Sequence, residues 1–595
     1  MGILWRLTCA AFCLWSGAIW AAAAADPETP EVDEVEAQHE QAQSLRLSEP
    51  DQVATPEVFA DDPSCRKQDV RSTILNRFQG SRIDSSDIER LAGRNIAQIR
   101  SIQVDVFDEA NPDEDKSLYR FLNKLHSNTK DYVVTSQLLF ATGEPLEPRV
   151  VYETERLLRS RGYLTTAFIV PDYICDTQVG LVVITRDSWS FDVEVSFSRS
   201  GGDTSTGFGL SDDNILGSGV ELAVGYEQDA DRHGIRYSFR TQHLLNTRIA
   251  TYLSYADTSD GRNVIMDIAQ PFYSRLTPWA AGVHHSDVTE TKIIRAADEI
   301  INEFRHENIR TEVYYGRAIS QNDRATQRLL VGYTEEKDHF FANDNTWLGF
   351  PDDRAAHYPW MEYQYLQDRY ATYRNLNQIQ RTEDVPLGIT FRLRAGYGDA
   401  SPSTHGKVWR YSGSYQHIFN VDNQHLLSFN LQAEGRDHRD SHSNDSAIWS
   451  SSLAYNYMIN YQHRWYTSFN YAAGQDLAQY EELTVGGNNG MRGYPTDYQR
   501  GNKRAVATLE RRYYSDWHWF NLVRVGAVAF LEVGKAWDGP TTDSSPTLAN
   551  VGFGLRLSSS KVRVGNIIHV DIAMPLVEQK GIDDYQLLIK ANRAF

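Results

Sequence analysis

Short segments with strict alternation of apolar and polar residues fill the chain from residue 191 to residue 595. FDVEVSF, GVELAVGYE and LVRVGAVAFLEVG each place an apolar side chain at every second position. A period of two is that of a β-strand whose two faces meet different surroundings. In the third segment Leu531 and Val533 share the apolar face, and Glu532 lies on the polar face. These residues therefore predict many half-apolar strands.

A closed β-barrel in a membrane suits this pattern better than a soluble sandwich. A sandwich hides its apolar faces in one core and rarely continues through about 400 residues as one domain. A membrane barrel turns its apolar faces outward, and its sheet must close because no strand edge can stay unpaired in hydrocarbon. With roughly 9 to 11 residues per span, we expect an all-β transmembrane barrel of about 16 antiparallel strands over residues 191–595.

Residues 96–190 follow a different order of periodicities. IRSIQVDVF alternates as a strand does, and apolar residues then recur at helical spacing. Pro148 opens a second helix, Gly162 ends it, and LTTAFIV and GLVVITRD follow as two strands. The order strand, helix, helix, strand, strand predicts one small α+β domain. The residues with helical spacing in the first helix are Leu118, Phe121, Leu122 and Leu125.

The N-terminal residues read as export and tether segments. Residues 1–25 carry Arg6, an apolar run and a series of alanines, which is the pattern of a secretory signal peptide. Residues 26–62 are acidic and almost without aromatic residues, so we expect a disordered linker. Residues 63–95 are expected to form a short helical lead-in to the α+β domain, around 70–78 and 87–91.

Composition supports an exported β-protein and excludes one class of partner. The chain contains 32 Tyr, 24 Phe and 13 Trp, which suits aromatic side chains at membrane interfaces. Its net charge of -20 opposes nucleic-acid binding, which requires basic patches. Cys65 and Cys175 remain after signal cleavage, and we expect them to form a disulfide in an oxidising compartment.

The C-terminal residues end on an aromatic side chain. Tyr585, Leu587 and Ile589 alternate with Gln586, Leu588 and Lys590, and the chain stops at Phe595. This ending is similar to the C-terminal signal by which outer-membrane barrels are delivered to their insertion machinery.

A motif near the C-terminus is specific to one superfamily. Met491, Arg492, Gly493 and Tyr494, within LTVGGNNGMRGYPTDYQRGNKRAVATLERRYY, resemble the V-R-G-F/Y signature of the superfamily that includes BamA, TamA and the TpsB transporters of two-partner secretion. GEPLEPRVVYETERLLRSRGYL looks like the second-helix signature of a POTRA domain, the periplasmic module of that superfamily. The resemblance implies a surface-antigen-type barrel and an extracellular loop that folds back into the barrel lumen.

The resemblance also implies acidic partners for Arg492 on the inner wall. Alternation places Glu510 and Glu532 on the polar, inward face, and an arginine in a confined lumen is costly without a carboxylate partner. We expect Arg492 to pair with Glu532, with Glu510 nearby. Glu532 lies in FLEVG, where the family usually has F-x-D-x-G. Tight turns in the loop are expected at Gly486, Gly487, Gly490 and Gly493.

We expect no enzyme activity, no cofactor and no metal, because no catalytic or ligating constellation stands out. Client polypeptides, outer-membrane lipid and possible periplasmic chaperones or accessory lipoproteins are the expected partners, with no nucleic acid. The resemblance implies an outer-membrane protein insertase or translocase with its N-terminal domain in the periplasm. Two alternatives stay open: a two-partner secretion transporter for one exported partner, and a passive solute porin.

Overall fold

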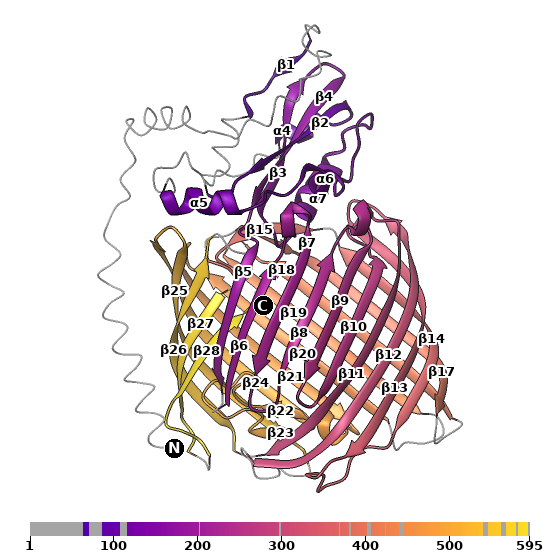
Figure 1. The fold of residues 1–595 in the computed structure, drawn as a ribbon, viewed down its shortest axis with the longest axis vertical. Coiled ribbons are helices and arrows are strands. Elements are labelled where there is room, and N and C mark those ends of the chain that lie inside the picture. Colours follow the sequence, from indigo (N-terminus) through magenta and orange to yellow (C-terminus); the bar gives the residue numbers. More distant parts are fainter. Residues whose placement is uncertain are drawn as a thin grey trace. The chain divides into compact units, whose positions relative to one another are not determined.

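A closed ring of antiparallel strands makes up most of the computed structural model (Figure 1). Each strand pairs with its neighbours in sequence, and the last strand pairs with the first. The strands of the ring are β5 (Phe191–Ser200), β6 (Asp203–Asp212), β7 (Val220–Gln228), β8 (His233–Thr241), β9 (Ala250–Thr258), β10 (Gly261–Gln270), β11 (Trp279–Ala296), β12 (Glu299–Gln321), β13 (Ala325–Ala342), β14 (Arg354–Gln367), β17 (Gly388–Ser401), β18 (Gly406–Asn420), β19 (His425–His438), β20 (Ser446–Met458), β21 (His463–Gln475), β24 (Lys503–Trp519), β25 (Val523–Trp537), β26 (Leu548–Ser559), β27 (Ile567–Pro575) and β28 (Gln586–Asn592).

The structure describes residues 64–70, 86–107, 116–200, 203–296, 299–367, 369–379, 382–401, 406–422, 424–438, 445–539, 546–560, 567–578 and 581–592. The expected signal peptide, the acidic linker and Phe595 lie outside these residues. So does most of the helix expected at 70–78.

The expected strand count of about 16 was too low, because the ring contains 20 described strands. The error has a simple cause. Strands β5 to β10 are 9 or 10 residues long and together occupy only residues 191–270. The estimate allowed about 25 residues for each strand with its loop, whereas these six strands need about half of that.

Alternation separates the two faces of the ring as the sequence pattern indicates. In β25, Leu531 and Val533 are 39% and 37% exposed on the outer face, while Glu532 is 2% exposed on the inner face. Other large apolar side chains on the outer faces, such as Phe469 and Phe553, are also exposed. The barrel thus presents an apolar outer surface and a polar, charged bore.

The seam between the first and last strands is short. β28 and β5 share one register pair among the described residues, Ile589 with Arg199. On their other edges β28 pairs with β27 over seven positions and β5 pairs with β6 over ten. In the part of the two strands that the structure describes, backbone pairing at this junction is therefore sparser than at the adjacent ones.

The α+β domain contains a four-stranded sheet in the order β1-β3-β4-β2. Strand β2 (Asn95–Val104) pairs in parallel with β4 (Gln178–Asp187), and β3 (Leu164–Ile174) pairs antiparallel with β4. Between β2 and β3 lie helices α5 (Ser117–Leu125), α6 (Asp131–Thr135) and α7 (Pro148–Arg159). The short helix α6 is additional to the expected order. No described helix is long and apolar enough to cross a membrane.

A short strand and a disulfide complete this domain. β1 (Arg66–Lys67) pairs with the end of β3, and Cys65 is bonded to Cys175. Helix α4 (Ser86–Glu89) lies within the segment 63–95, which was expected to be helical, whereas β1 was not foreseen. The domain core is built from side chains of the helices and the sheet, among them Val134, Leu158, Ile169, Leu181 and Val183.

Candidate functional site

The loop between β21 and β24 carries the candidate site. Within it β22 (Leu483–Val485) pairs with β23 (Gln499–Gly501), so the loop begins as a narrow hairpin. Residues 486–498 form its tip. Met491 and Tyr494 at this tip are fully buried, and they pack with Val506 on β24 and Leu548 on β26. The loop therefore lies against the inner wall of the barrel.

Arg492 donates to carboxylates on three different strands. Its Nε lies 2.6 Å from Oε1 of Glu532 on β25, and its backbone N–H lies 2.9 Å from Oε2 of the same side chain. Its Nη2 lies 2.5 Å from Glu510 Oε1 on β24, and its Nη1 lies 3.1 Å from Asp571 Oδ2 on β27. All five N–H donors of a guanidinium lie in one plane, so strands β24, β25 and β27 must be aligned for this arrangement to form.

Asp571 was not among the expected partners, although the sequence contains a signal for it. In HVDIAMPL, Val570 and Ile572 alternate with Asp571, which places the carboxylate on the polar face. Asp571 also accepts from Arg556 at 2.5 Å, and Glu510 accepts from Arg512 at 2.7 Å. The cluster thus contains three arginines and three carboxylates, a balanced set of charges in a confined bore.

Contacts around Arg492 fix its orientation. The guanidinium carbon lies 3.7 Å from the centre of the Phe530 ring, a cation–π distance. The hydroxyl of Tyr494 donates to the carbonyl of Ala549 at 2.6 Å. Met491 packs against Gly534, where an added Cβ would lie 2.9 Å from the Met491 sulfur. The glycine of FLEVG therefore makes room for the residue that precedes the arginine.

Two loop glycines have clear geometric roles. Gly490 has φ +94°, a conformation that side-chain-bearing residues rarely adopt. A Cβ on Gly486 would lie 2.3 Å from the carbonyl oxygen of Pro495, so only glycine allows this close approach. Gly487 donates its N–H to the same carbonyl at 3.0 Å, and Gly493 packs beside Asn550.

A second anchor holds the beginning of the same loop to another part of the wall. Glu481, in the turn Gln479–Glu481, accepts both terminal nitrogens of Arg436 on β19 at 2.8 and 2.9 Å. The centre of the Tyr480 ring also lies 5.7 Å from the centre of the Phe340 ring on β13. In the ring, β19 lies four places and β13 eight places from β25, which carries Glu532. Sequence reasoning did not foresee this anchor, because alternation does not show which distant strand a loop will meet.

A hairpin from the other end of the barrel also enters the bore. β15 (Tyr370–Arg374) pairs with β16 (Thr382–Pro386) between β14 and β17, which pair directly with each other in the wall. We call residues 369–379 and 382–387 the inner hairpin. Its Asn375 donates to the carbonyl of Tyr461 at 2.9 Å, and Arg464 on β21 donates to the carbonyl of Leu376.

The inner hairpin and the loop reach one cavity. Asn377 and Ile379 line a cavity of about 260 Å³ together with Gly490, Arg492 and Lys590. Glu383 holds the tip of the inner hairpin by accepting the backbone N–H groups of residues 376, 377 and 378 at 2.8, 2.9 and 3.2 Å. Two ordered segments that enter from opposite ends therefore obstruct the bore.

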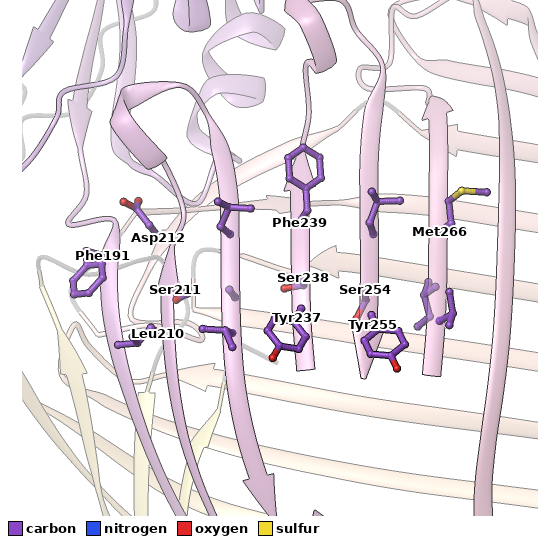
Figure 2. A pocket seen from close by; sticks show the side chains of 16 residues that line it. Phe191, Leu210, Ser211, Asp212, Tyr237, Ser238, Phe239, Ser254, Tyr255 and Met266 are labelled. Carbon is purple, nitrogen blue, oxygen red and sulfur yellow. The ribbon is translucent and has the colours of Figure 1, made fainter. Parts of the chain in front are cut away.

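The outer surface of the first strands is hollowed and apolar. A shallow hollow of about 720 Å³ extends over β5 to β10, and Figure 2 shows its lining side chains on neighbouring strands. Phe191, Leu210, Tyr237 and Tyr255 there are 38% to 50% exposed. Apolar side chains exposed over several adjacent strands fit contact with lipid.

Two adjacent histidines on β11 have side-chain partners. His284 and His285 on β11 point to opposite faces of the strand and contact Asp267 at 2.6 Å and Thr311 at 2.9 Å, respectively. No group of three or more metal-ligating side chains is arranged to hold an ion in the described part of the chain.

No protein-family model and no curated protein matches this sequence. Among solved structures, the chain is similar to BamA from Haemophilus ducreyi lacking POTRA domains 1-3, with 13% identity, 83% of this chain and 84% of that chain covered, and a TM-score of 0.37. CdiB from Escherichia coli has 14% identity, coverage of 85% and 77%, and a TM-score of 0.44. CdiB from Acinetobacter baumannii has 10% identity, coverage of 84% and 74%, and a TM-score of 0.38. Each shares few residues with this chain, so none of them assigns a function to it.

Proposed function

We propose that this protein is an outer-membrane insertase or translocase of the superfamily that includes BamA, TamA and the TpsB transporters. Its α+β domain acts as a POTRA-like module in the periplasm, and its barrel passes client polypeptides into or across the membrane. The partners are client polypeptides in extended form and membrane lipid, and periplasmic chaperones or accessory lipoproteins can deliver the clients. The work requires no catalytic residues and no cofactor.

The short seam between β28 and β5 is the observation that carries this proposal. Among the described residues, one register pair joins these strands, whereas seven and ten pairs join them to their other neighbours. A barrel used only as a pore benefits from a fully paired wall, since an unpaired edge in hydrocarbon is costly. A barrel that adds client strands at its edge needs a junction that opens, and backbone pairing there accepts many client sequences.

The obstructed bore supports the same choice over a passive porin. Arg492 and the inner hairpin occupy the lumen from its two ends, with buried side chains at both places. An open solute path would leave the lumen filled with water, as in porins. Secretion through the lumen would require both segments to leave it, whereas insertion at the seam does not.

The disulfide supports the periplasmic assignment of the domain. Cys65 and Cys175 are bonded, and structural disulfides form in oxidising compartments such as the periplasm. The domain also has an edge strand, β2, which is last in the strand order; residues 143–146 pair with its beginning, and beyond residue 96 no further strand pairs with that edge among the described residues. Such an edge offers backbone groups to an extended client.

A reversible lock across the seam tests the proposal. Arg199→Cys and Ile589→Cys introduce thiols at the one register pair, in a strain whose only copy of the protein carries both changes. Under oxidising conditions we expect at least one outer-membrane or exported protein to fall in abundance, with recovery after reduction. Quantitative proteomics of the outer membrane and the medium provides the measurement.

The matched control locks a junction that is already fully paired. Leu393→Cys and Gly413→Cys join β17 and β18, where the two residues are register partners. This lock should change nothing. If the seam lock leaves the outer-membrane and exported proteomes equal to those of the control, insertion at the seam is wrong.

A further inference from the structure

Helix α5 presents two different faces. On one face Tyr119 is buried, and Asn123 exchanges hydrogen bonds with the backbone of Phe107 at 2.9 and 3.1 Å. This face packs on the α+β domain, in a cluster that also contains Val106. The helix is therefore held in place by its own domain.

The opposite face is apolar and exposed. Leu118, Phe121 and Leu125 are 58%, 56% and 61% exposed, and their spacing of three and four places them on one side of the helix. Arg120 and Lys124 lie away from this stripe, and the helix contains no acidic residue. An apolar stripe of this size on a short helix is typical of a surface that is covered in the working protein.

The position of α5 indicates what covers it. The hydroxyl of Tyr119 donates to the carbonyl of Phe520 at 2.5 Å, and Leu522 packs against the same cluster. These two residues lie in the turn between β24 and β25. The side chains of that turn and the adjoining strand are exposed aromatic groups: Trp517 (64%), Trp519 (47%) and Phe520 (82%).

Exposed aromatic residues at strand ends mark the level of the lipid headgroups in β-barrels. The apolar stripe of α5 thus continues the aromatic rim of the barrel, to which the helix is hydrogen-bonded. We propose that α5 is an interfacial helix that inserts Leu118, Phe121 and Leu125 into the periplasmic leaflet beside β24 and β25. This inference rests on the membrane placement of the barrel proposed above.

The insertion has the physical form of a short monotopic helix. Its apolar side chains enter the boundary between headgroups and acyl chains, while Arg120 and Lys124 stay in water or reach headgroup phosphates. Apolar contact drives the insertion, and electrostatic attraction to headgroups does not, because the acidic segment 108–115 precedes the helix in a chain of net charge -20. The contact fixes the α+β domain at the membrane surface next to the barrel wall.

A fluorescence experiment tests this placement in phosphatidylcholine vesicles, on the protein without residues 1–25, which contain Cys9 and Cys13. Single cysteines introduced by Phe121→Cys, Arg120→Cys and Phe553→Cys are labelled with an environment-sensitive dye, while the native cysteines remain in their disulfide. Phe553 is 62% exposed on the outer face of β26 and reports the membrane placement of the barrel. Quenchers carried on lipid acyl chains and iodide in water then report the surroundings of each dye.

We expect the Phe121 and Phe553 labels to be quenched by lipid and shielded from iodide, and the Arg120 label to show the reverse. The pattern should persist with and without phosphatidylglycerol, since apolar contact drives insertion. If Phe553 is quenched by lipid and Phe121 only by iodide, the stripe faces water or a protein client, and this inference is overturned while the barrel placement stands. If neither label is quenched by lipid, the membrane placement itself is wrong.

Discussion

Arg492 and Asp571 meet in the bore, with Nη1 3.1 Å from Oδ2, although 79 positions separate them in the sequence. Asp571 also accepts a hydrogen bond from Arg556, and Arg492 also donates hydrogen bonds to Glu510 and Glu532. The tip of one loop therefore depends on the register of three strands near the C-terminus. A shift in the register of any of these strands should therefore displace the loop.

Arg492→Ala is expected to release the loop without unfolding the barrel. The substitution leaves three buried carboxylates with two arginines, and removal of one partner from a buried ion pair costs about 3–5 kcal/mol. Cleavage of the loop by a protease added outside cells should increase sharply, while the heat-modifiable migration of the folded barrel persists. Arg492→Lys keeps the charge but cannot reach three acids, so its protection should be intermediate. Wild-type protection in Arg492→Ala would contradict the role of these contacts.

Shortening the loop alone is expected to open the bore only partly. The inner hairpin still contributes Asn377 and Ile379 to the cavity when residues 483–501 are replaced by a short linker. Ion conductance in planar bilayers should rise modestly for this change or for replacement of residues 375–379 by glycines. The combined variant should conduct more than the sum of the two. Full conductance from loop shortening alone would show that the inner hairpin does not obstruct the bore.

Gly534→Ala is expected to displace Met491 and weaken the docked loop. The added Cβ would lie 2.9 Å from the Met491 sulfur, and overpacking of this kind typically costs about 1–3 kcal/mol. Gly225→Ala is the matched control, since its Cβ would find its nearest atom at 3.8 Å. Unfolding in urea, followed by tryptophan fluorescence, compares the two variants. Equal stabilities would contradict the close packing at Gly534.

Cys65→Ser is expected to destabilise the α+β domain and leave the barrel intact. The disulfide closes a loop with a sequence separation of 110, for which the chain-entropy model gives about 4–5 kcal/mol. Urea should unfold the domain at a lower concentration, as detected by its proteolysis, while heat-modifiable migration of the barrel stays normal. Cys175→Ser should have the same effect, and the double substitution should add little. Unchanged urea resistance in all three variants would contradict a stabilising role of the bond.

Acidification is expected to loosen the turn that carries His243, between β8 and β9. Burial, and to a smaller extent the neighbouring Arg161, lower the pKa of His243 to about 4. Neither ring nitrogen has a hydrogen-bond partner among the described residues. In the unfolded chain the histidine has its ordinary pKa of 6.5, so below that pH the unfolded state binds a proton that the folded state does not. The contribution of the neutral, buried His243 to folding stability is therefore fully present above pH 6.5 and is lost as the pH falls toward 4. Protease resistance of residues 242–249 should decrease between pH 7.5 and pH 5.

His243→Gln serves as the control for this dependence. The variant cannot gain a proton in this range, so its turn should resist the protease equally at both pH values. A decrease as large as that of the wild type would show that a group other than His243 causes the effect.

The sequence predicts the barrel and part of the site because both follow from alternation. The inward position of Glu532 and the outward position of Leu531 depend only on a period of two within one strand. The second anchor at Glu481 depends on which strand lies opposite, which is a property of the closed ring. The number of strands was underestimated because strands β5 to β10 are short and closely spaced, whereas the estimate assumed one average length for every strand with its loop.

The exposed stripe of α5 illustrates another limit. Helical spacing predicts that Leu118, Phe121 and Leu125 share a side, but it does not say whether that side meets protein, lipid or water. In the structure, Tyr119 and Asn123 on the opposite face of the helix contact the domain, and the stripe stays exposed. We infer the surroundings of the stripe from the turn between β24 and β25, which lies beside α5 although it is distant in the sequence.

The loop that carries Arg492 is attached to the wall at two places, at Glu481 to Arg436 on β19 and at Arg492 to Glu532 on β25. These two strands lie four places apart in the ring. A segment fastened at both points acts as a brace along that arc of the wall and resists a change in its curvature. Detachment at either end is expected to let this arc flatten or bend more easily than the rest of the cylinder.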